Sequence, residues 1–179
     1  MKDANGTPLL ARVIARAQST QLPVFVTMPS LDHPRAALLQ GTTATAIPVP
    51  DRSEGMAASI RRGIDGLPDQ TPAVMILPGD MPDLTTDDLI QMFQTFKNNP
   101  GCIIRATTED GRPGHPVIFP ASLFGELRQI TGDQGGRAVV KSHLDQLRQI
   151  ALPGNHALCD LDTPADWAAW HSLNRPNDH

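Results

Sequence analysis

The stretch AVMILPGDMP, residues 73–82, contains five apolar residues in a row, followed by a proline, a glycine and an aspartate. A short apolar run bounded by turn residues is typical of a buried strand. In open α/β sheets, ligands bind outside the carboxyl ends of the strands, so Asp80 is predicted to project into a binding crevice. A carboxylate held there is suited to ligate Mg²⁺. The alternative is a solvated turn, because Pro-Gly-Asp is common turn chemistry.

Helical and strand-like segments alternate on both sides of this strand, which favours a mostly parallel sheet wrapped by helices. One α/β domain is predicted over residues 1–173, followed by a tail at residues 174–179. Strands are predicted at residues 22–28, 46–49, 73–77, 102–106, 116–119 and 149–152. Helices are predicted at residues 9–17, 34–40, 54–64, 123–129, 136–143 and 164–173, and one more that starts at Thr85 or Thr86 and ends near Phe96.

Composition excludes several classes of protein. The 179 residues include 15 Lys and Arg against 19 Asp and Glu, a net charge of −4 that argues against a nucleic-acid binder. Cys102 and Cys159 lack metal-ligand spacing, which is typical of reduced thiols. Neither a membrane-spanning apolar run nor a signal-peptide pattern is found, so a cytoplasmic protein that does not contact membranes is expected.

A second group of carboxylates lies in the C-terminal segment DLDTPADW, residues 160–167. Alternation along an extended stretch would point Asp160 and Asp162 to the same side. Two like charges so placed are tolerated best beside a cation, which makes both residues candidate metal ligands. The alternative is that Thr163 only caps a helix that begins at Pro164.

Three further motifs carry weaker signals. In TGDQGGR, residues 131–137, glycines lead into a helix start and can hold an anion with backbone amides, although a plain loop is the simpler interpretation. His115 enters a strand, but no Ser or Cys partner for a triad is evident. Gly55 would permit close approach of a ligand and Ser59 could hydrogen-bond it, though an amphipathic helix explains both residues.

In this order, the motifs EGMAAS, LPGDMPDLTTDDL, GHPVIF, TGDQGGR and DLDTPADW resemble those of the molybdenum cofactor cytidylyltransferases and their close relatives. The resemblance extends over residues 6–170. It implies a Rossmann-like, three-layer nucleotidyltransferase fold with a mostly parallel sheet. It also implies transfer of CMP from CTP to molybdopterin, with release of pyrophosphate.

The same resemblance implies roles for individual residues. Asp80 would be the catalytic aspartate and would ligate the Mg²⁺ that carries the nucleoside triphosphate. Asp160 or Asp162 would provide a second contact to this metal. The residues beside the nucleotide would be Gly55, Ser59, Gly79 and Asp80, and those on the acceptor side His115 and Asp133.

Other functions are also consistent with these motifs. Guanylyl transfer from GTP is the near alternative within the same family. A second alternative is a non-catalytic binding module, a pseudoenzyme that acts with a molybdoenzyme during its assembly. A metal-dependent phosphatase with Asp80 as nucleophile is a weaker alternative, because it would need a second carboxylate two residues further on.

The N-terminal segment departs from the family pattern. The family begins with a strand and a glycine-rich loop of the form L-A-A-G-x-S-x-R-M-G, followed by a lysine. The present chain starts just before GTPLL, residues 6–10, which resembles the segment after that lysine. Without the first strand, the strands at 22–28 and 73–77 would keep unpaired edges or pair directly. We therefore expect the 179 residues alone to bind CTP or GTP poorly and to be inactive in transfer.

Overall fold

The computed structural model describes residues 7–50, 53, 55–132, 135–158 and 170. Its helices are α1 (Leu9–Ser19), α2 (Gly55–Asp65), α3 (Thr86–Asn98), α4 (Phe124–Leu127) and α5 (Arg137–Ser142), and its 3₁₀ helices are η1 (Pro34–Leu39), η2 (Ala121–Leu123) and η4 (Leu144–Gln146). Its strands are β1 (Phe25–Met28), β2 (Thr45–Pro48), β3 (Ala73–Ile76), β4 (Ile103–Thr107), β5 (Pro113–Pro120) and β6 (Leu147–Ala151).

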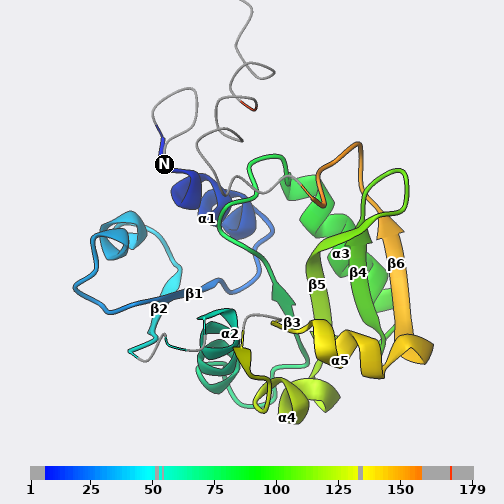
Figure 1. Ribbon diagram of the computed structural model, residues 1–179. Coiled ribbons are helices and arrows are strands. Elements are labelled where there is room, and N and C mark those ends of the chain that lie inside the picture. The colour runs from blue at the N-terminus through cyan, green and yellow to red at the C-terminus, as the bar shows by residue number, and fades with distance from the viewer. Residues whose placement is uncertain (1–6, 51–52, 54, 133–134, 159–169, 171–179) are drawn as a thin grey trace, which may run out of the picture.

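The larger sheet has four strands in the order β3-β5-β4-β6 (Figure 1). Strand β5 is antiparallel to both β3 and β4, and β4 is parallel to β6, so three of the four strands run in the same direction. The reversal of β5 follows from its short connection to β4, because a tight hairpin can join only antiparallel strands. The prediction of an α/β fold with a mostly parallel sheet is confirmed.

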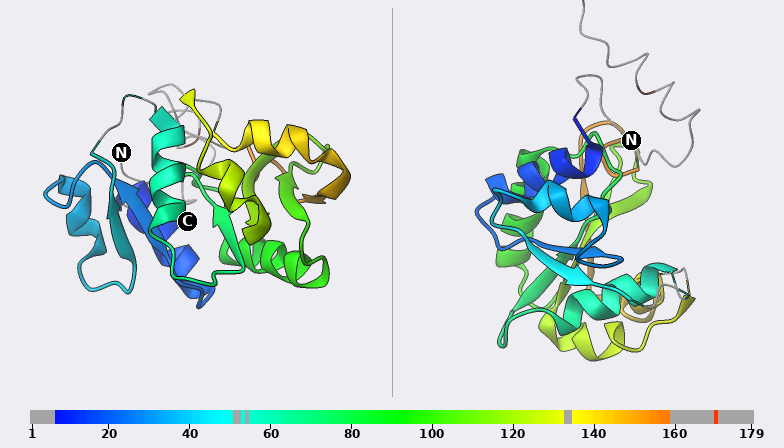
Figure 2. Two further views of the ribbon diagram at one scale, coloured as in Figure 1. Left: turned by 90° about the horizontal axis from the view of Figure 1, so that it is seen from below. Right: turned by 90° about the vertical axis from the view of Figure 1, so that its left-hand side faces the viewer.

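Strands β1 and β2 form a separate parallel sheet (Figure 2). Among the described residues, no strand joins β1 to β3, so the predicted interruption of the sheet is present and the two strands do not pair directly. Helix α2 contacts β1 and β2 as well as α4, and it therefore links the two parts of the molecule. All four residues of β3 are half-buried rather than fully buried, because β3 is an edge strand in this part of the chain.

The two faces of the four-stranded sheet support two hydrophobic cores, as expected when successive side chains of a strand point to opposite faces. On one face, Ile103, Val117 and Phe119 pack with apolar residues of α2, α4 and α5. On the other face, Ile104 and Ile118 pack with residues that include Met92 of α3. The predicted three-layer arrangement is confirmed. No helix in the described part of the chain is long and apolar enough to cross a membrane.

Helix α3 begins with a capping box. The Thr85 hydroxyl accepts from the backbone N–H of Asp88 (3.2 Å), and the backbone N–H of Thr85 donates to the Asp88 carboxylate (2.8 Å). The structure thereby selects Thr85 from the two predicted caps. The predicted helix at 34–40 is a 3₁₀ helix. The predicted helix at 164–173 and the tail at 174–179 lie outside the described residues except for Trp170.

A pair of glycine substitutions tests this packing. An added Cβ at Gly114 of β5 would lie 1.9 Å from the carbonyl oxygen of Ala157, whereas a Cβ at Gly125 of α4 would meet nothing within 4 Å. Overpacking typically lowers stability by about 1–3 kcal/mol, and removing a glycine from a helix raises it by roughly 0.5–1 kcal/mol. Urea unfolding should therefore show Gly114→Ala destabilised and Gly125→Ala unchanged or stabilised. Equal stabilities of the two variants would contradict the docking of Ala157 on β5.

Candidate functional site

Asp80 lies in the turn that follows β3, at the predicted carboxyl end of that strand. Its side chain is half-buried, and its Oδ1 atom is fully buried. The neighbouring Gly79 is exposed, and an added Cβ would lie 2.9 Å from the Leu10 Cδ1 atom of α1. Glycine at this position therefore leaves room for the Leu10 side chain beside the turn that carries Asp80.

Helix α1 also holds the next part of this loop by hydrogen bonds. One guanidinium nitrogen of Arg16 donates to the carbonyl oxygens of Pro82 and Leu84, each at 2.5 Å. The Thr86 hydroxyl in turn donates to the carbonyl oxygen of Arg16 (3.3 Å). Met81 is 2% exposed and packs with Met92 of α3 in the core on the other side of the loop. The loop is thus fixed on the side that faces α1.

A third contact holds the loop through Trp170. The indole N–H of Trp170 donates to the Asp83 carboxylate (2.7 Å), and the guanidinium of Arg12 lies 5.8 Å from the ring centroid. Trp170 is 6% exposed and packs with Leu9 and Val13 of α1. Sequence reasoning assigned no role to Arg16 or Trp170. No local signal identifies them, because their partners are 66 and 87 residues away in the chain.

The other buried carboxylate near this loop has a structural role. Asp88 is 3% exposed, and one of its oxygens accepts from the backbone and hydroxyl of Thr85. The same oxygen lies 2.8 Å from Nδ1 of His156, in the segment after β6. Asp88 therefore joins the start of α3 to the chain beyond β6, whereas Asp80 lies eight residues earlier, in the turn that follows β3.

His115 lies at the same edge of the sheet as Asp80. Because Ile76, the last residue of β3, pairs with Val117, the start of β5 lies beside the end of β3. The backbone N–H of His115 donates to the carbonyl oxygen of Ala157 (2.8 Å), and the ring Nδ1 atom is buried. The structure thus brings two of the predicted site residues to adjacent strand ends.

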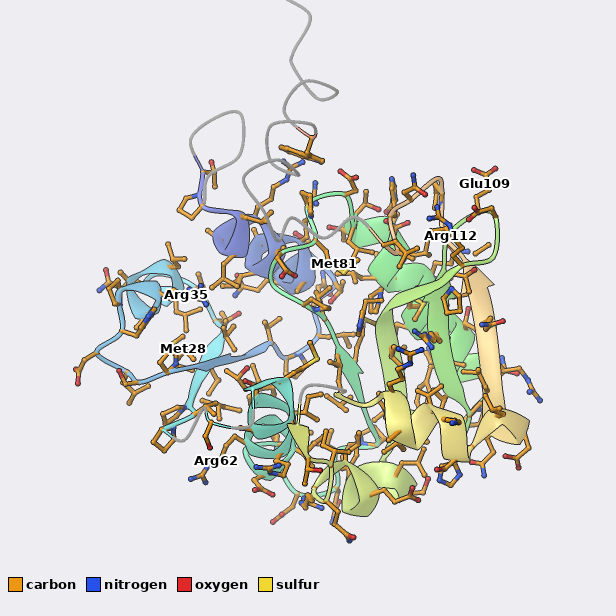
Figure 3. All side chains as sticks on the ribbon, in the orientation of Figure 1. Met28, Arg35, Arg62, Met81, Glu109 and Arg112 are labelled. Carbon is orange, nitrogen blue, oxygen red and sulfur yellow. The ribbon has the colours of Figure 1, made fainter. Side chains whose placement is uncertain are left out.

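The hairpin between β4 and β5 approaches this edge from the other side. The Thr108 hydroxyl and the Arg112 guanidinium both donate to the Asp110 carboxylate, and these bonds lower the pKa of Asp110. Arg112 also donates to the side chain of Asn155 in the segment after β6 (2.7 Å). Figure 3 shows Arg112 and Glu109 at this hairpin, beside the end of β6. These contacts hold together the two segments that flank His115.

The motif EGMAAS, predicted beside the nucleotide, contacts the motif TGDQGGR, predicted on the acceptor side. Gly55 begins α2 with a φ of +56°, a conformation that glycine adopts most easily. Ser59 lies one turn further along this helix and is half-buried. An added Cβ at Gly135 would lie 2.7 Å from the sulfur of Met56, so the loop before α5 packs on the start of α2.

Three predicted site residues, Asp133, Asp160 and Asp162, lie outside the described residues, and their roles stay predictions. In the part of the chain that the structure describes, no group of three or more His, Cys, Asp or Glu residues is arranged to hold a metal. A cavity of about 610 Å³ opens between α4 and α5. Its walls include Gly132 and Gly135 but neither Asp80 nor His115, so this cavity is distinct from the strand-end site.

Several solved structures share the fold of this chain. The crystal structure of Rv0371c from Mycobacterium tuberculosis H37Rv is 25% identical, with a TM-score of 0.77 over 93% of this chain and 85% of that one. Its manganese complex is 23% identical, with a TM-score of 0.79 over 96% and 90%. CMP:2-keto-3-deoxy-manno-octonic acid synthetase, solved with CTP, is 13% identical and shares the fold, with a TM-score of 0.73 over 97% and 89%.

The fold is therefore that of the Rossmann-like nucleotidyltransferases. The family model of the MobA-like NTP transferase domain matches residues 1–147. The chain belongs to this family and is a nucleotidyltransferase that uses a nucleoside triphosphate. The comparison with curated proteins found no match.

The contact between Trp170 and Asp83 generates a prediction. Trp170→Phe keeps an aromatic ring against α1 but removes the N–H that donates to the carboxylate. A hydrogen bond to a charged group contributes about 1.5–3 kcal/mol, and because Asp83 is only half-buried, the expected loss is at the lower end. Urea unfolding of the two single variants and the double variant with Asp83→Ala should show coupling between the residues. Strictly additive effects would contradict the contact.

Proposed function

We propose that this protein transfers CMP from CTP to a molybdopterin-type acceptor and releases pyrophosphate. The observation that carries the proposal is the place of Asp80, a half-buried carboxylate at the carboxyl end of β3, in a loop held by α1. Membership of the MobA-like NTP transferase family supplies the class of reaction. A relative in fold solved with CTP supports the choice of nucleotide.

In the proposed reaction, an oxygen of the acceptor phosphate attacks the α-phosphorus of CTP. The new P–O bond forms as the bond between the α-phosphorus and the α,β-bridging oxygen breaks, and pyrophosphate leaves with the bonding electrons. The protein's contribution is mainly to position the two phosphates in line and to offset their charge, so no covalent nucleophile is required. A rigid loop suits this role, because misplacement of reacting groups by about 1 Å can slow a reaction on the order of a hundredfold.

Asp80 fits a divalent metal because carboxylate oxygens are the donors that Mg²⁺ and Mn²⁺ prefer. When bound, such an ion neutralises phosphate charge and orients the triphosphate. We propose Asp80 as one ligand and either Asp160 or Asp162 as a second. The manganese complex of the Mycobacterium tuberculosis relative supports a divalent ion in this fold.

The remaining predicted residues are proposed for the two sides of the site. Gly55, Ser59 and Gly79 would lie beside the nucleotide. His115 and Asp133 would lie on the acceptor side. The packing of Gly135 against Met56 supports this arrangement, because it joins the loop that carries Asp133 to the start of α2.

The role of Asp80 is tested by an isosteric substitution. In any active form of this protein, Asp80→Asn should reduce pyrophosphate release from CTP by at least about a hundredfold, since the amide lacks the negative charge that binds the metal. Asp87→Asn is the matched control, because Asp87 is exposed in the first turn of α3 and undergoes the same charge change. Both variants should unfold at similar urea concentrations. An Asp80→Asn protein as active as Asp87→Asn would overturn the assignment.

The C-terminal aspartates are separated by single substitutions. Asp160→Ala and Asp162→Ala should differ, with one of them weakening Mn²⁺ binding about tenfold or more and the other having little effect. Calorimetric titration of each variant with Mn²⁺, with and without CTP, measures the difference. If both variants bind Mn²⁺ as the unmodified chain does, the segment serves only to cap a helix.

A further inference from the structure

A second cavity, of about 370 Å³, opens between α2 and the end of α4. Its walls are Ala58, Arg61, Arg62 and Asp65 of α2, together with Arg128, the residue that caps the end of α4. The four residues of α2 are spaced at i, i+3, i+4 and i+7, so they lie on one face of the helix. Ala58 is 4% exposed, and its small side chain leaves space between the longer side chains around it.

The residues that line this cavity carry more positive than negative charge. Three guanidinium groups and one carboxylate give a net charge of three minus one, or +2. The whole chain has a net charge of −4. The positive charge is therefore a local feature of this face, and it attracts anions that the chain as a whole repels.

Contacts between α2 and the segment around the end of α4 hold the walls of the cavity. The Arg61 guanidinium donates to the carbonyl oxygen of Ile130 (2.6 Å). The Nε–H of Arg128 donates to the Asp65 carboxylate (2.9 Å). Each contact joins residues more than 60 positions apart in the chain, so the tertiary structure brings the three guanidinium groups together.

Two of these arginines have donors that no described residue uses. Arg62 is exposed, and its side chain forms no hydrogen bond or ion pair within the described part of the chain. Among the same residues, Arg128 uses only its Nε–H, so its terminal nitrogens are available. Figure 3 shows Arg62 on α2, away from Met81 in the loop after β3. The N–H fork of an arginine matches the two oxygens of a carboxylate.

The presence of Asp65 favours separate carboxylates over one compact anion. A phosphate dianion at the centre of the cavity would be repelled by Asp65 twice as strongly as a single carboxylate at the same distance. Exposed ion pairs are individually weak, so stable binding needs several of them at once. An extended segment with several Asp or Glu side chains can bind Arg62 and Arg128 at the same time without placing a charge next to Asp65.

We propose that this cavity is a docking site for an acidic segment of a partner protein, whose carboxylates bind Arg62 and Arg128. None of the residues that line it is assigned to the strand-end site. Docking therefore requires neither CTP nor a metal ion, and it does not depend on the proposed function.

The probe is a short dye-labelled oligoglutamate peptide, and binding is followed by fluorescence anisotropy. An oligoglutamine peptide of the same length is the uncharged control, and it should not bind. Binding of the oligoglutamate should be saturable at about 0.01 M salt and weaker at about 0.15 M salt, because the Debye length falls from roughly 30 Å to roughly 8 Å. Equal binding of the two peptides would overturn the proposal.

Substitutions in the cavity should change the affinity in opposite directions. Arg62→Gln should weaken oligoglutamate binding about fivefold, as expected for the loss of one exposed ion pair, and the double variant with Arg128→Gln should weaken it further. Asp65→Asn should strengthen binding about twofold or more, because it removes the negative charge while its amide oxygen can still accept from Arg128. Weaker binding by Asp65→Asn would contradict the proposal.

Arg148→Gln is the matched control for Arg62→Gln. Arg148 is an exposed arginine on β6, at the opposite edge of the four-stranded sheet from β3. Its substitution makes the same change in net charge and should leave the affinity within about twofold, since salt screens distant charges. Equal weakening by the two variants would show that the peptide responds only to net charge, and the docking site would be wrong.

Inorganic phosphate separates an acidic partner from a small anion. Phosphate should displace the oligoglutamate no better than chloride at the same ionic strength. If phosphate displaces the peptide at much lower ionic strength, and Arg62→Gln abolishes this difference, the cavity binds a small anion and its assignment to a partner protein is wrong.

Discussion

The hydrogen bonding of β5 to both β3 and β4 is the constraint on which the site depends. This pairing is antiparallel on both sides, so the start of β5 lies at the edge where β3 ends. Asp80 and His115 thereby reach adjacent strand ends although 35 positions separate them in the sequence. The same register places Arg105 opposite Val117, on the face that carries α5. A shift of one residue would move these side chains to the opposite face.

A strand end positions a carboxylate only if the following loop is rigid. Here α1 holds the loop by the hydrogen bonds of Arg16 and by the packing of Trp170 against Leu9 and Val13. These contacts act on one short segment from different directions. The conformation of the loop therefore depends on contacts with neighbouring segments as much as on its own Pro-Gly turn. Catalysis of nucleotidyl transfer depends on positioning and charge. Contacts that hold the loop therefore also hold its carboxylate in place for the reaction.

The sequence by itself determined the α/β class, the strand predicted at 73–77 and observed at Ala73–Ile76, the helix cap at Thr85 or Thr86 and the place of Asp80 after its strand. These features depend on neighbours within a few residues: an apolar run, a proline and glycine, a hydroxyl before a helix. Only the tertiary structure decided that β3 is a half-buried edge strand and that Arg16 and Trp170 hold the loop. Strand order and register set these contacts. The residues that they join are too far apart in the chain for a local sequence pattern to indicate them.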